Sequence, residues 1–379
     1  MNFDLTEEQK LIRDNVYDFA QNEIVPGAPE RDRTGKFPLD LIKKMADLGL
    51  MGLPVDEKYG GAGADYVSYL LATEEITRAD ASLGLTYDAH IALGIAPIYY
   101  FGSEEQKNKY LPVLCSAEAM GALGLTEPEA GSDSGATKTT AVLDGDSWLI
   151  NGSKCFITNA SYSKFVTITA VTEKGKGTGG ISTFVVPTDA PGFEIRSNYE
   201  KMGLHSSNTT ELFFENVRIP QENLLGPLNG GFKQIMKVLD GGRLAVAAMC
   251  VGIAQACLDA SVKYAGERIQ FGQSISKFQA IQFKLADIKK NIELGRLMYL
   301  KGGWLKDNNR PYTQEASIAK LFCSEMATRA ALDAIQIHGG YGYIKEFPVE
   351  RYLRDAKLLE IGEGTSEVQR IIISRGLGL

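Results

Sequence analysis

The sequence lacks the clustered positive charge that marks a nucleic-acid-binding protein. Its Lys and Arg residues are spread along the chain, the formal net charge is −7, and the pI is near 5.3. Because nucleic-acid binding depends on a basic patch or stripe, this composition argues against such a partner. An anionic ligand would need a local cationic pocket.

Paired cysteines and metal-binding motifs are also missing. The chain has 5 cysteines, an odd number, and none stands in a CxxC or other metal-ligand spacing. They lie at positions 115, 155, 250, 257 and 323. This pattern predicts reduced core residues of an intracellular protein, and it predicts no metal site.

Long apolar runs are absent from the sequence as well. No stretch approaches the roughly 18 apolar residues that a membrane-spanning helix needs. The first residues, MNFDLTEEQ, show neither the apolar core of a signal peptide nor an Arg-rich transit pattern. We therefore expect a cytoplasmic enzyme of bacterial type without a membrane span.

The first part of the chain, residues 1–119, has the pattern of a helical domain. Thr6 and Gln9 have the spacing of a capping box, which predicts a helix that starts at this point. Apolar residues then follow at helical spacing, namely Leu11, Ile12, Val16, Phe19 and Ile24. Further helices are predicted at about 39–49 and 66–78, with a glycine-rich loop between them.

Residues 120–229 change to the pattern of short strands. Strands are predicted at Trp148–Ile150, Phe165–Val171, Ile181–Val186 and Glu211–Phe214. Asp144-Gly145, Asn151-Gly152 and a glycine cluster are predicted to separate them as turns. The pattern indicates a small antiparallel sheet domain.

The glycine cluster Gly175–Gly180 formally matches the GxGxxG fingerprint of dinucleotide-binding proteins. That fingerprint requires a helix directly after it, whereas here a predicted strand follows. We interpret the cluster as a hairpin turn, and the pattern gives no support for a nicotinamide cofactor.

Helical periodicity returns in residues 230–379, with Ile281, Leu285, Ile288 and Ile292 in one stripe. The predicted fold class is α+β: an N-terminal helical domain, a central antiparallel β-barrel-like domain and a C-terminal four-helix bundle. Helical domains on both sides of a sheet domain predict a cleft at their junction.

Three segments combine glycine with polar residues in ways that suggest a ligand. Gly124–Asp133 opens the sheet domain, Gln336–Tyr343 precedes the run Glu350–Asp355, and Ile361–Thr365 places Glu363 between two glycines. Glycine lets backbone N–H groups approach a phosphate or a flavin edge. Each segment alone could equally be an ordinary turn, and Glu363 alone could be a solvated loop residue.

Together, the motifs GLTEPEAGSD and QIHGGYGYxxEFPxExxxRD resemble those of the acyl-CoA dehydrogenase family. The resemblance covers essentially the whole chain, and the family has the same domain order. It implies an FAD-dependent enzyme that oxidises an acyl-CoA to a trans-2-enoyl-CoA and passes electrons to an electron-transfer flavoprotein. It also implies a homo-oligomer, typically a homotetramer.

The resemblance implies which residues contact FAD. The strand Phe156–Thr158 would cover one face of the isoalloxazine, with the Thr158 hydroxyl near N5; many relatives have Trp where Phe156 stands. Arg268 and Gly339 belong to a group that would hold the pyrophosphate and adenine of FAD in a neighbouring subunit. The implied FAD contacts are Leu123, Leu125, Thr126, Ser132, Phe156, Thr158, Arg268, Phe271, Gln279, Gln336, Gly339, Gly340, Thr365 and Glu367.

The resemblance also implies the catalytic base and the substrate contacts. Glu363 matches the base that takes the α-proton of the thioester. Some relatives carry the base on the preceding long helix, where this chain has Gly242, so Glu363 is the one carboxylate left in a family base position. The implied substrate contacts are Ser132, Asp240, Arg243, Gly364 and Arg375, with Asp88 as a further candidate.

Two departures from the family pattern bear on the acyl group. Relatives that act on straight chains often have Tyr immediately before the base, where this chain has Gly362. The smaller residue predicts a wider pocket and a short or medium, branched or alicyclic acyl group such as cyclohexanecarboxyl-CoA, with a short straight chain as the close competitor.

Asp88 and His90 are the second departure. Asp88 could face solvent or cap a helix while His90 is a hydrogen-bonded core residue. Alternatively, Asp88 could touch the acyl group, as a polar contact or as an auxiliary base for a ring substrate.

Two other functions remain open from the sequence. An acyl-CoA oxidase would pass its electrons to O₂, although oxidases of this fold are usually much longer. A non-catalytic acyl-CoA or flavin-binding protein would be unexpected with Glu363, Arg243 and Arg375 all in place.

Overall fold

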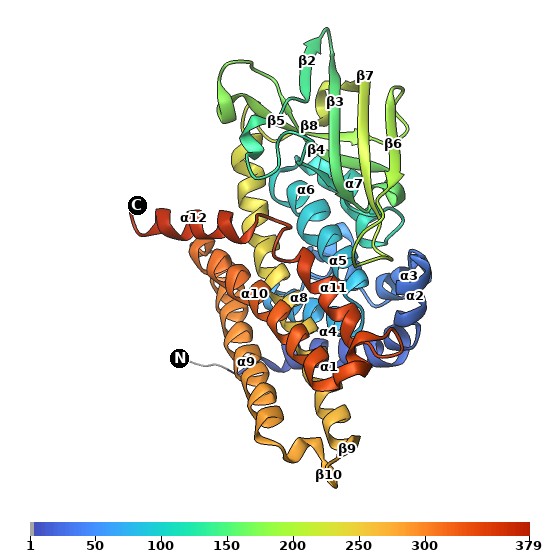
Figure 1. Cartoon of the computed structure of the whole chain (residues 1–379). Helices are drawn as coiled ribbons and strands as arrows, with labels where there is room; N and C mark the ends of the chain where they lie inside the picture. Colours follow the sequence, from blue (N-terminus) through green and yellow to red (C-terminus); the bar gives the residue numbers. More distant parts are fainter. Residues whose placement is uncertain (1–3) are drawn as a thin grey trace.

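The computed structural model describes residues 4–379 as two helical modules packed against each other, with a sheet at one end of them (Figure 1). The first module begins at the predicted capping box, where Thr6 and Gln9 cap each other. Among the apolar residues at helical spacing, Val16 and Ile24 are buried, whereas Leu11 is 61% exposed. The helices are α1 (Glu7–Phe19), α2 (Ala28–Thr34), α3 (Leu39–Asp47), α4 (Tyr66–Ala79), α5 (Ala81–Asp88), α6 (Ala96–Phe101) and α7 (Glu104–Cys115).

The middle module is one mixed sheet with the order β6-β7-β3-β2-β4-β5-β8, and β1 pairs with β4. Most neighbours are antiparallel, as predicted. The pairs β1–β4 and β2–β4 are parallel, so the expectation of a wholly antiparallel sheet is wrong there. The strands are β1 (Leu123–Gly124), β2 (Thr140–Asp144), β3 (Ser147–Thr158), β4 (Phe165–Val171), β5 (Ile181–Pro187), β6 (Phe193–Asn198), β7 (Thr209–Pro220) and β8 (Leu224–Leu225).

Two of the three predicted turns are present. Asp144-Gly145 closes the β2–β3 hairpin, and the glycine cluster Gly175–Gly180 joins β4 to β5. Asn151-Gly152 is instead inside β3, where the pairing with β7 shifts register. A Cβ at position 152 would lie 2.5 Å from Thr139 Oγ1, so this glycine permits close strand contact instead of a turn.

The C-terminal module contains three long helices and two shorter ones. Its elements are α8 (Gly231–Glu267), β9 (Ile269–Gln270), β10 (Gln273–Ser274), α9 (Gln279–Asp307), α10 (Thr313–His338), α11 (Val349–Leu358) and α12 (Ser366–Gly376). Ile288 and Ile292 of the predicted stripe are buried, and Ile281 and Leu285 pack partly buried at its edge. The order helical, sheet, helical is therefore confirmed.

Helix α8 corrects the expectation about long apolar segments. Its 37 residues, with a mean hydropathy of 1.7 in the most apolar window, are long and apolar enough to cross a membrane. However, 78% of that window is buried inside the protein, against helices that include α4 of the first module. We therefore interpret α8 as a central core helix.

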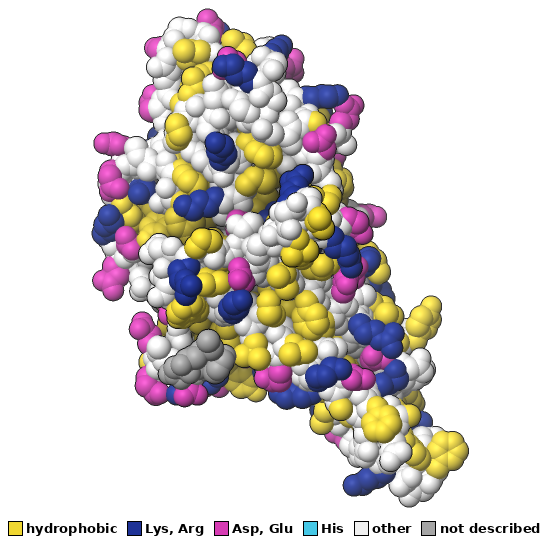
Figure 2. Space-filling model, turned by 90° about the vertical axis from the view of Figure 1, so that its left-hand side faces the viewer, with side chains coloured by type: hydrophobic (Ala, Val, Ile, Leu, Met, Phe, Trp, Pro, Cys, Tyr) yellow, Lys and Arg dark blue, Asp and Glu magenta, His cyan; other side chains and the backbone are white. Residues whose placement is uncertain are grey.

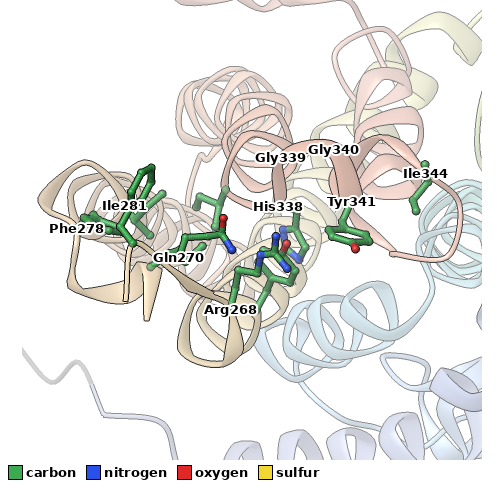
Figure 3. A pocket seen from close by; sticks show the side chains of 13 residues that line it. Arg268, Gln270, Phe278, Ile281, His338, Gly339, Gly340, Tyr341 and Ile344 are labelled. Atoms are coloured by element: carbon green, nitrogen blue, oxygen red, sulfur yellow. The ribbon is translucent and has the colours of Figure 1, made fainter. Parts of the chain in front are cut away.

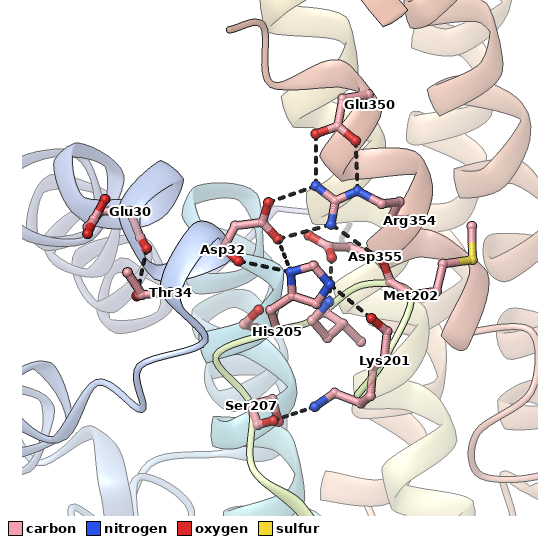
Figure 4. Close-up of polar contacts among 12 residues, drawn as sticks. Glu30, Asp32, Thr34, Lys201, Met202, His205, Ser207, Glu350, Arg354 and Asp355 are labelled. Carbon is pink, nitrogen blue, oxygen red and sulfur yellow. Dashed lines mark hydrogen bonds and ion pairs between the residues drawn. The ribbon is translucent and has the colours of Figure 1, made fainter. Parts of the chain in front are cut away.

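A polar cluster joins all three modules (Figure 4). Arg354 on α11 makes paired hydrogen bonds to Asp32 on α2, at 2.7 and 3.0 Å, and also binds Glu350. His205, from the segment between β6 and β7, lies 3.0 Å from the same Asp32 carboxylate. Asp355, which follows Arg354 on α11, accepts a hydrogen bond from the Leu204 N–H at 2.6 Å. This cluster fixes α11, which leads directly to the segment that contains Glu363.

Candidate functional site

Glu363 lies in the tight connection between α11 and α12. Its backbone is in the left-handed region, with φ of 55°, and Gly364 has φ of 98°. A non-glycine residue in this region is uncommon and points to a constraint imposed by the surroundings. The connection ends at Thr365, whose hydroxyl accepts from the Val368 N–H and caps α12.

Side chains from three helices hold this connection in place. Lys320 on α10 donates to the Gly364 carbonyl oxygen at 2.8 Å, and Gln369 donates to the same oxygen at 2.9 Å. Arg243 on α8 contacts the Glu363 carbonyl oxygen at 3.4 Å. These donors satisfy backbone carbonyls that no helix uses, and they stabilise the left-handed conformation of Glu363.

The carboxyl group of Glu363 lies in a desolvated place. Among residues 4–379, no donor side chain or backbone N–H forms a hydrogen bond to the buried Oε2 atom. Burial raises the pKa of Glu363 to about 7, while Asp88, Arg243 and Lys320 lower it against that trend. A carboxyl group with a pKa near neutrality is suited to act as a general base at physiological pH.

Asp88, at the end of α5, faces the same place. Its side chain is fully buried, and Tyr69 on α4 donates to Oδ1 at 2.9 Å. The carboxyl groups of Asp88 and Glu363 lie within hydrogen-bonding reach of each other. The expectation that Asp88 faces solvent or caps a helix is therefore wrong, because the helix continues past it as a π-helical turn, Ala89–Ile95.

His90 is a hydrogen-bonded core residue, as one of the two interpretations of this segment predicted. Its Nε2 lies 3.0 Å from the Met51 carbonyl oxygen, and its Nδ1 accepts from the Gly121 N–H at 2.8 Å. Burial lowers the pKa of His90 to about 4, so the ring is neutral at physiological pH. It has no contact with the carboxyl pair.

The segments expected to line the flavin meet at the edge of β3. The Cys155 N–H donates to the Thr126 carbonyl oxygen at 2.9 Å, which joins the Gly124–Asp133 segment to β3 next to Phe156. A register shift with β7 begins at this point, and Phe156 has φ of 59°. Leu123 is buried, Leu125, Thr126 and Thr158 are partly exposed, and Ser132 is exposed.

The exposed ring of Phe156 favours a planar ligand at this edge of β3. Its ring is 63% exposed and stacks on Tyr199 with centroids 4.9 Å apart. The bulge turns this ring out of the sheet, where it offers a flat apolar face beside backbone and hydroxyl donors. These are the groups that a flavin ring and its polar edge need.

A buried ion pair that no sequence motif predicts lies under this segment. Lys154, with no exposed surface, donates to Glu127 at 2.8 Å and to the Leu125 carbonyl oxygen at 3.2 Å. Burial lowers the pKa of Lys154 to about 8; the lysine and its neighbours hold the pKa of Glu127 at about 2 despite burial. Glu127 is one of two acidic residues in the TEPE motif, and nothing in the sequence identified Lys154 as its partner.

Asp240 and Arg243 form an ion pair on α8, with Nη1 and Oδ1 2.7 Å apart. Arg243 is only 4% exposed and points toward the Glu363 backbone, so it contacts the candidate base segment directly. Thr313 at the start of α10 donates to the other Asp240 oxygen at 2.6 Å. Arg375 and Glu367 are exposed on α12.

The remaining expected cofactor residues lie at the far end of α8, around a cavity of about 520 Å³ (Figure 3). Arg268, Phe271, Gly339 and Gly340 line it, whereas Gln279 and Gln336 are exposed outside its lining. Figure 3 shows Arg268 and His338 between Phe278 on one side and Tyr341 on the other.

This cavity is well separated from Glu363 in the same chain. Arg243 is on α8 and Arg268 directly follows the last residue of this helix, 25 positions later, which corresponds to roughly 37 Å along a helix. Phe271 at the rim is 94% exposed. Figure 2 shows hydrophobic side chains at this lower tip of the molecule, where Figure 1 places β9 and β10.

Three family models match the chain: the N-terminal domain of acyl-CoA dehydrogenase at residues 6–118, the middle domain at 122–217 and the C-terminal domain at 229–378. The chain is 60% identical over 378 residues to the probable acyl-CoA dehydrogenase YngJ of Bacillus subtilis, with 100% of both chains covered. It is 46% identical over 374 residues to the short-chain specific acyl-CoA dehydrogenase of Clostridium acetobutylicum, with 99% of both covered.

Solved structures give the same result. The butyryl-CoA dehydrogenase of Megasphaera elsdenii has a TM-score of 0.98 at 42% identity, with 100% of both chains covered. A chain from a study of the electron-transferring flavoprotein of Acidaminococcus fermentans has a TM-score of 0.98 at 47% identity, with 100% of this chain and 99% of that chain covered.

Proposed function

Because this chain belongs to the acyl-CoA dehydrogenase family, we propose that it oxidises a short acyl-CoA between its α and β carbons, with Glu363 as the base. The observation that carries this proposal is the position of the Glu363 carboxyl group, buried and held by its own strained backbone. Members of the family are FAD-dependent flavoproteins, and the bulge at Phe156 fits such a cofactor. When bound, FAD supplies the acceptor for the hydride that leaves the β carbon.

The residues of the chain prepare the proton transfer. The α-hydrogen of a thioester is barely acidic, so its removal needs a correctly placed base and stabilisation of the enolate oxygen. Among residues 4–379, the Glu363 N–H has no hydrogen-bond acceptor, which leaves it available to the thioester oxygen, as the family resemblance implies. One such donor contributes about 2.7–4 kcal/mol to the transition state.

Two cations near Glu363 favour the ionised form of its carboxyl group before it accepts the proton. Arg243 and Lys320 favour the ionised carboxylate, whereas burial opposes it, and the balance puts the pKa of Glu363 at about 7. A substrate that excludes the remaining water would raise this pKa further and bring it closer to that of the α-proton.

We further propose a short, branched or alicyclic acyl group, with a short straight chain as the competitor. A Cβ at Gly362 would meet only the Leu358 carbonyl oxygen, at 3.7 Å, so the backbone beside the base is unobstructed. The relatives named short-chain specific and butyryl-CoA dehydrogenase support the small size of the acyl group. Gly362 supports the additional width.

The proposal extends to assembly, location and the electron acceptor. A homotetramer would bring the cavity around Arg268 next to the cofactor of another subunit, since it is far from Glu363 in its own chain. The relative studied with an electron-transferring flavoprotein supports such a protein as the acceptor. The bacterial relatives support a cytoplasmic location.

The test is the anaerobic addition of acyl-CoA thioesters to the yellow holoenzyme. Butyryl-, isobutyryl-, 2-methylbutyryl- and cyclohexanecarboxyl-CoA should bleach the flavin band to different extents, and kcat/KM with an artificial acceptor should follow the same order. Glu363→Gln should abolish bleaching but retain FAD. Glu325→Gln, an exposed carboxylate on α10 that pairs with Arg370, is the matched control.

Three outcomes would contradict the proposal. An unbleached wild-type flavin with every thioester would indicate a non-catalytic binder. Fast reoxidation by air, with substrate present, would indicate an oxidase. A strong preference for long straight chains would refute the argument from Gly362.

A further inference from the structure

Two buried carboxyl oxygens near the base have no conventional partner. Within residues 4–379, Asp88 Oδ2 and Glu363 Oε2 are the carboxyl oxygens that are buried without a hydrogen bond to a donor side chain or backbone N–H. The two carboxyl groups are within hydrogen-bonding reach of each other. A buried polar atom without a partner is costly, so this coincidence requires an explanation.

A single proton explains both atoms. Two ionised carboxylates at this separation would repel each other strongly in a site without water. If one carboxyl group is protonated, its O–H donates to the other, and both unpartnered oxygens are satisfied at once. The remaining question is which of the two side chains carries the proton.

The neighbours of the pair answer this question. Cations lie on the Glu363 side of the pair: Arg243 contacts the Glu363 carbonyl oxygen and Lys320 donates to the Gly364 carbonyl oxygen. Both lower the pKa of the Glu363 carboxyl group. Asp88 is surrounded by neutral phenols. The titratable and charged groups that face the pair are Tyr66 and Tyr69 on α4, Tyr87 on α5, Arg243 on α8 and Lys320 on α10.

The hydrogen bond from Tyr69 agrees with this assignment. Burial raises the pKa of Tyr69 well above its ordinary value, so its hydroxyl remains a donor to Asp88 Oδ1. A protonated Asp88 can accept at Oδ1 and donate from Oδ2 simultaneously. Burial and the charge of Glu363 both raise the pKa of Asp88 well above its ordinary value.

We propose that Asp88 is a positioning residue that carries a proton and donates it as a hydrogen bond to Glu363 Oε2, which holds the base ionised and oriented. This inference rests on the proposed function of Glu363. It differs from the hypothesis that Asp88 is an auxiliary base, because a base must accept a proton and Asp88 already has one. Its place before a π-helical turn fits a site residue, since such turns often occur at functional sites.

The test compares the pH dependence of kcat/KM in the wild type, Asp88→Leu and Asp88→Asn holoenzymes. Leucine removes the donor, so the acid limb of the profile should move to higher pH by about one unit. Asparagine retains an N–H donor, so its acid limb should stay within about half a unit of the wild type. A role in packing alone would not distinguish these two variants in this way.

An infrared measurement tests the protonation state without turnover. Because burial also raises the pKa of Asp355 to about 7, the Asp88 band is read from a difference spectrum: the wild-type holoenzyme at neutral pH should show a protonated C=O stretch that the Asp88→Asn holoenzyme lacks. Tyr69→Phe should shift the band, because it deletes the hydrogen bond to Oδ1. Tyr299→Phe is the matched control, since this buried tyrosine donates to Glu74 instead.

Several outcomes would overturn the inference. An Asp88→Asn enzyme as inactive as Glu363→Gln, with FAD still bound, would make Asp88 a second base. Acid limbs of Asp88→Leu and wild type that coincide would show that the two carboxyl groups do not interact. The absence of a protonated band assignable to Asp88 would show that Asp88 is ionised. A failure of the proposed function is distinct from all of these, because no thioester would then bleach the wild-type flavin.

Discussion

The Glu363 carboxyl group lies against the backbone of Gly242 on α8. A Cβ at position 242 would stand 2.0 Å from Glu363 Oε2 and 2.8 Å from its Cδ, which is closer than any real contact. The absence of a side chain at 242 is therefore a condition for the observed position of Glu363. Some relatives carry the base at this position of the long helix. In those relatives the side chain of that base would occupy the space that Glu363 fills here.

Gly242→Ala should displace the Glu363 carboxyl group and reduce kcat/KM by about 100-fold, as expected for a displacement of about 1 Å in a catalytic group. FAD content should be unchanged, because the clash of a Cβ at position 242 is with the Glu363 side chain and with no implied FAD contact. Gly266→Ala on the same helix is the control, since a Cβ there would meet nothing within 4 Å. Equal losses in the two variants would argue against this contact.

Removing one partner of the buried Lys154–Glu127 pair should destabilise the protein more than removing both partners. Glu127→Gln leaves a buried ammonium group without its counter-ion, and should lower the free energy of unfolding by about 3–5 kcal/mol. The double variant Glu127→Gln with Lys154→Met should recover part of that loss, because no charge remains. Urea unfolding of the holoenzyme measures both.

A surface pair provides the control for this measurement. Lys164 and Glu118 are both more than half exposed, so Glu118→Gln should cost about 1 kcal/mol or less. If Glu127→Gln costs no more than Glu118→Gln, the buried pair does not stabilise the segment that lines the flavin.

Asp355 predicts a specific dependence of stability on pH. Burial raises its pKa from 3.8 to about 7, although the Leu204 N–H opposes this. The protonated form is therefore favoured by folding, and its contribution is complete below the unfolded pKa and is lost as the pH rises through about 7. Asp355→Asn has no such titration.

The difference in Tm between Asp355→Asn and wild type should therefore become more favourable to the variant from pH 5 to pH 8. Asp287→Asn, on the exposed surface of α9, should show no change over this range, because the neighbouring Lys290 lowers the pKa of Asp287. A constant difference for Asp355→Asn would show that its pKa is not raised.

Gly362→Tyr tests the width of the acyl pocket. An aromatic side chain next to the base should reduce kcat/KM for cyclohexanecarboxyl-CoA more than for butyryl-CoA, and change their ratio by about 10-fold or more. Gly179→Tyr is the control, because a Cβ at this glycine in the β4–β5 connection meets nothing within 4 Å. A uniform loss for all thioesters would place the ring outside the acyl pocket.

Much of the fold could be predicted because local chemistry and tertiary structure agree. The capping box at Thr6 and the strand Phe165–Val171 occur where the sequence predicts them. The errors arose where a local signal had two physical meanings. Gly152 permits close strand contact instead of a turn, and α8 is apolar because it is a core helix.

Short sequence motifs predicted individual residues of the candidate site, but not the partners of those residues. The position of Glu363 followed from its flanking glycines and the family resemblance, and its backbone conformation is consistent with both. Asp88, Lys320 and Lys154 could not be assigned partners, because each bonds to a residue at least 19 positions away. Pairing across such separations depends on how helices, strands and loops pack together, which periodicity does not determine.

The five cysteines give the protein an internal reporter of its motions. All are free and buried, and burial raises the pKa of every one of these thiols. A thiol that is both inaccessible and protonated reacts with an alkylating reagent only during a transient opening of the chain around it. The labelling rate at each cysteine would then show how often the surrounding part of the enzyme opens transiently. Bound ligand should slow the alkylation of those cysteines whose surroundings it stabilises.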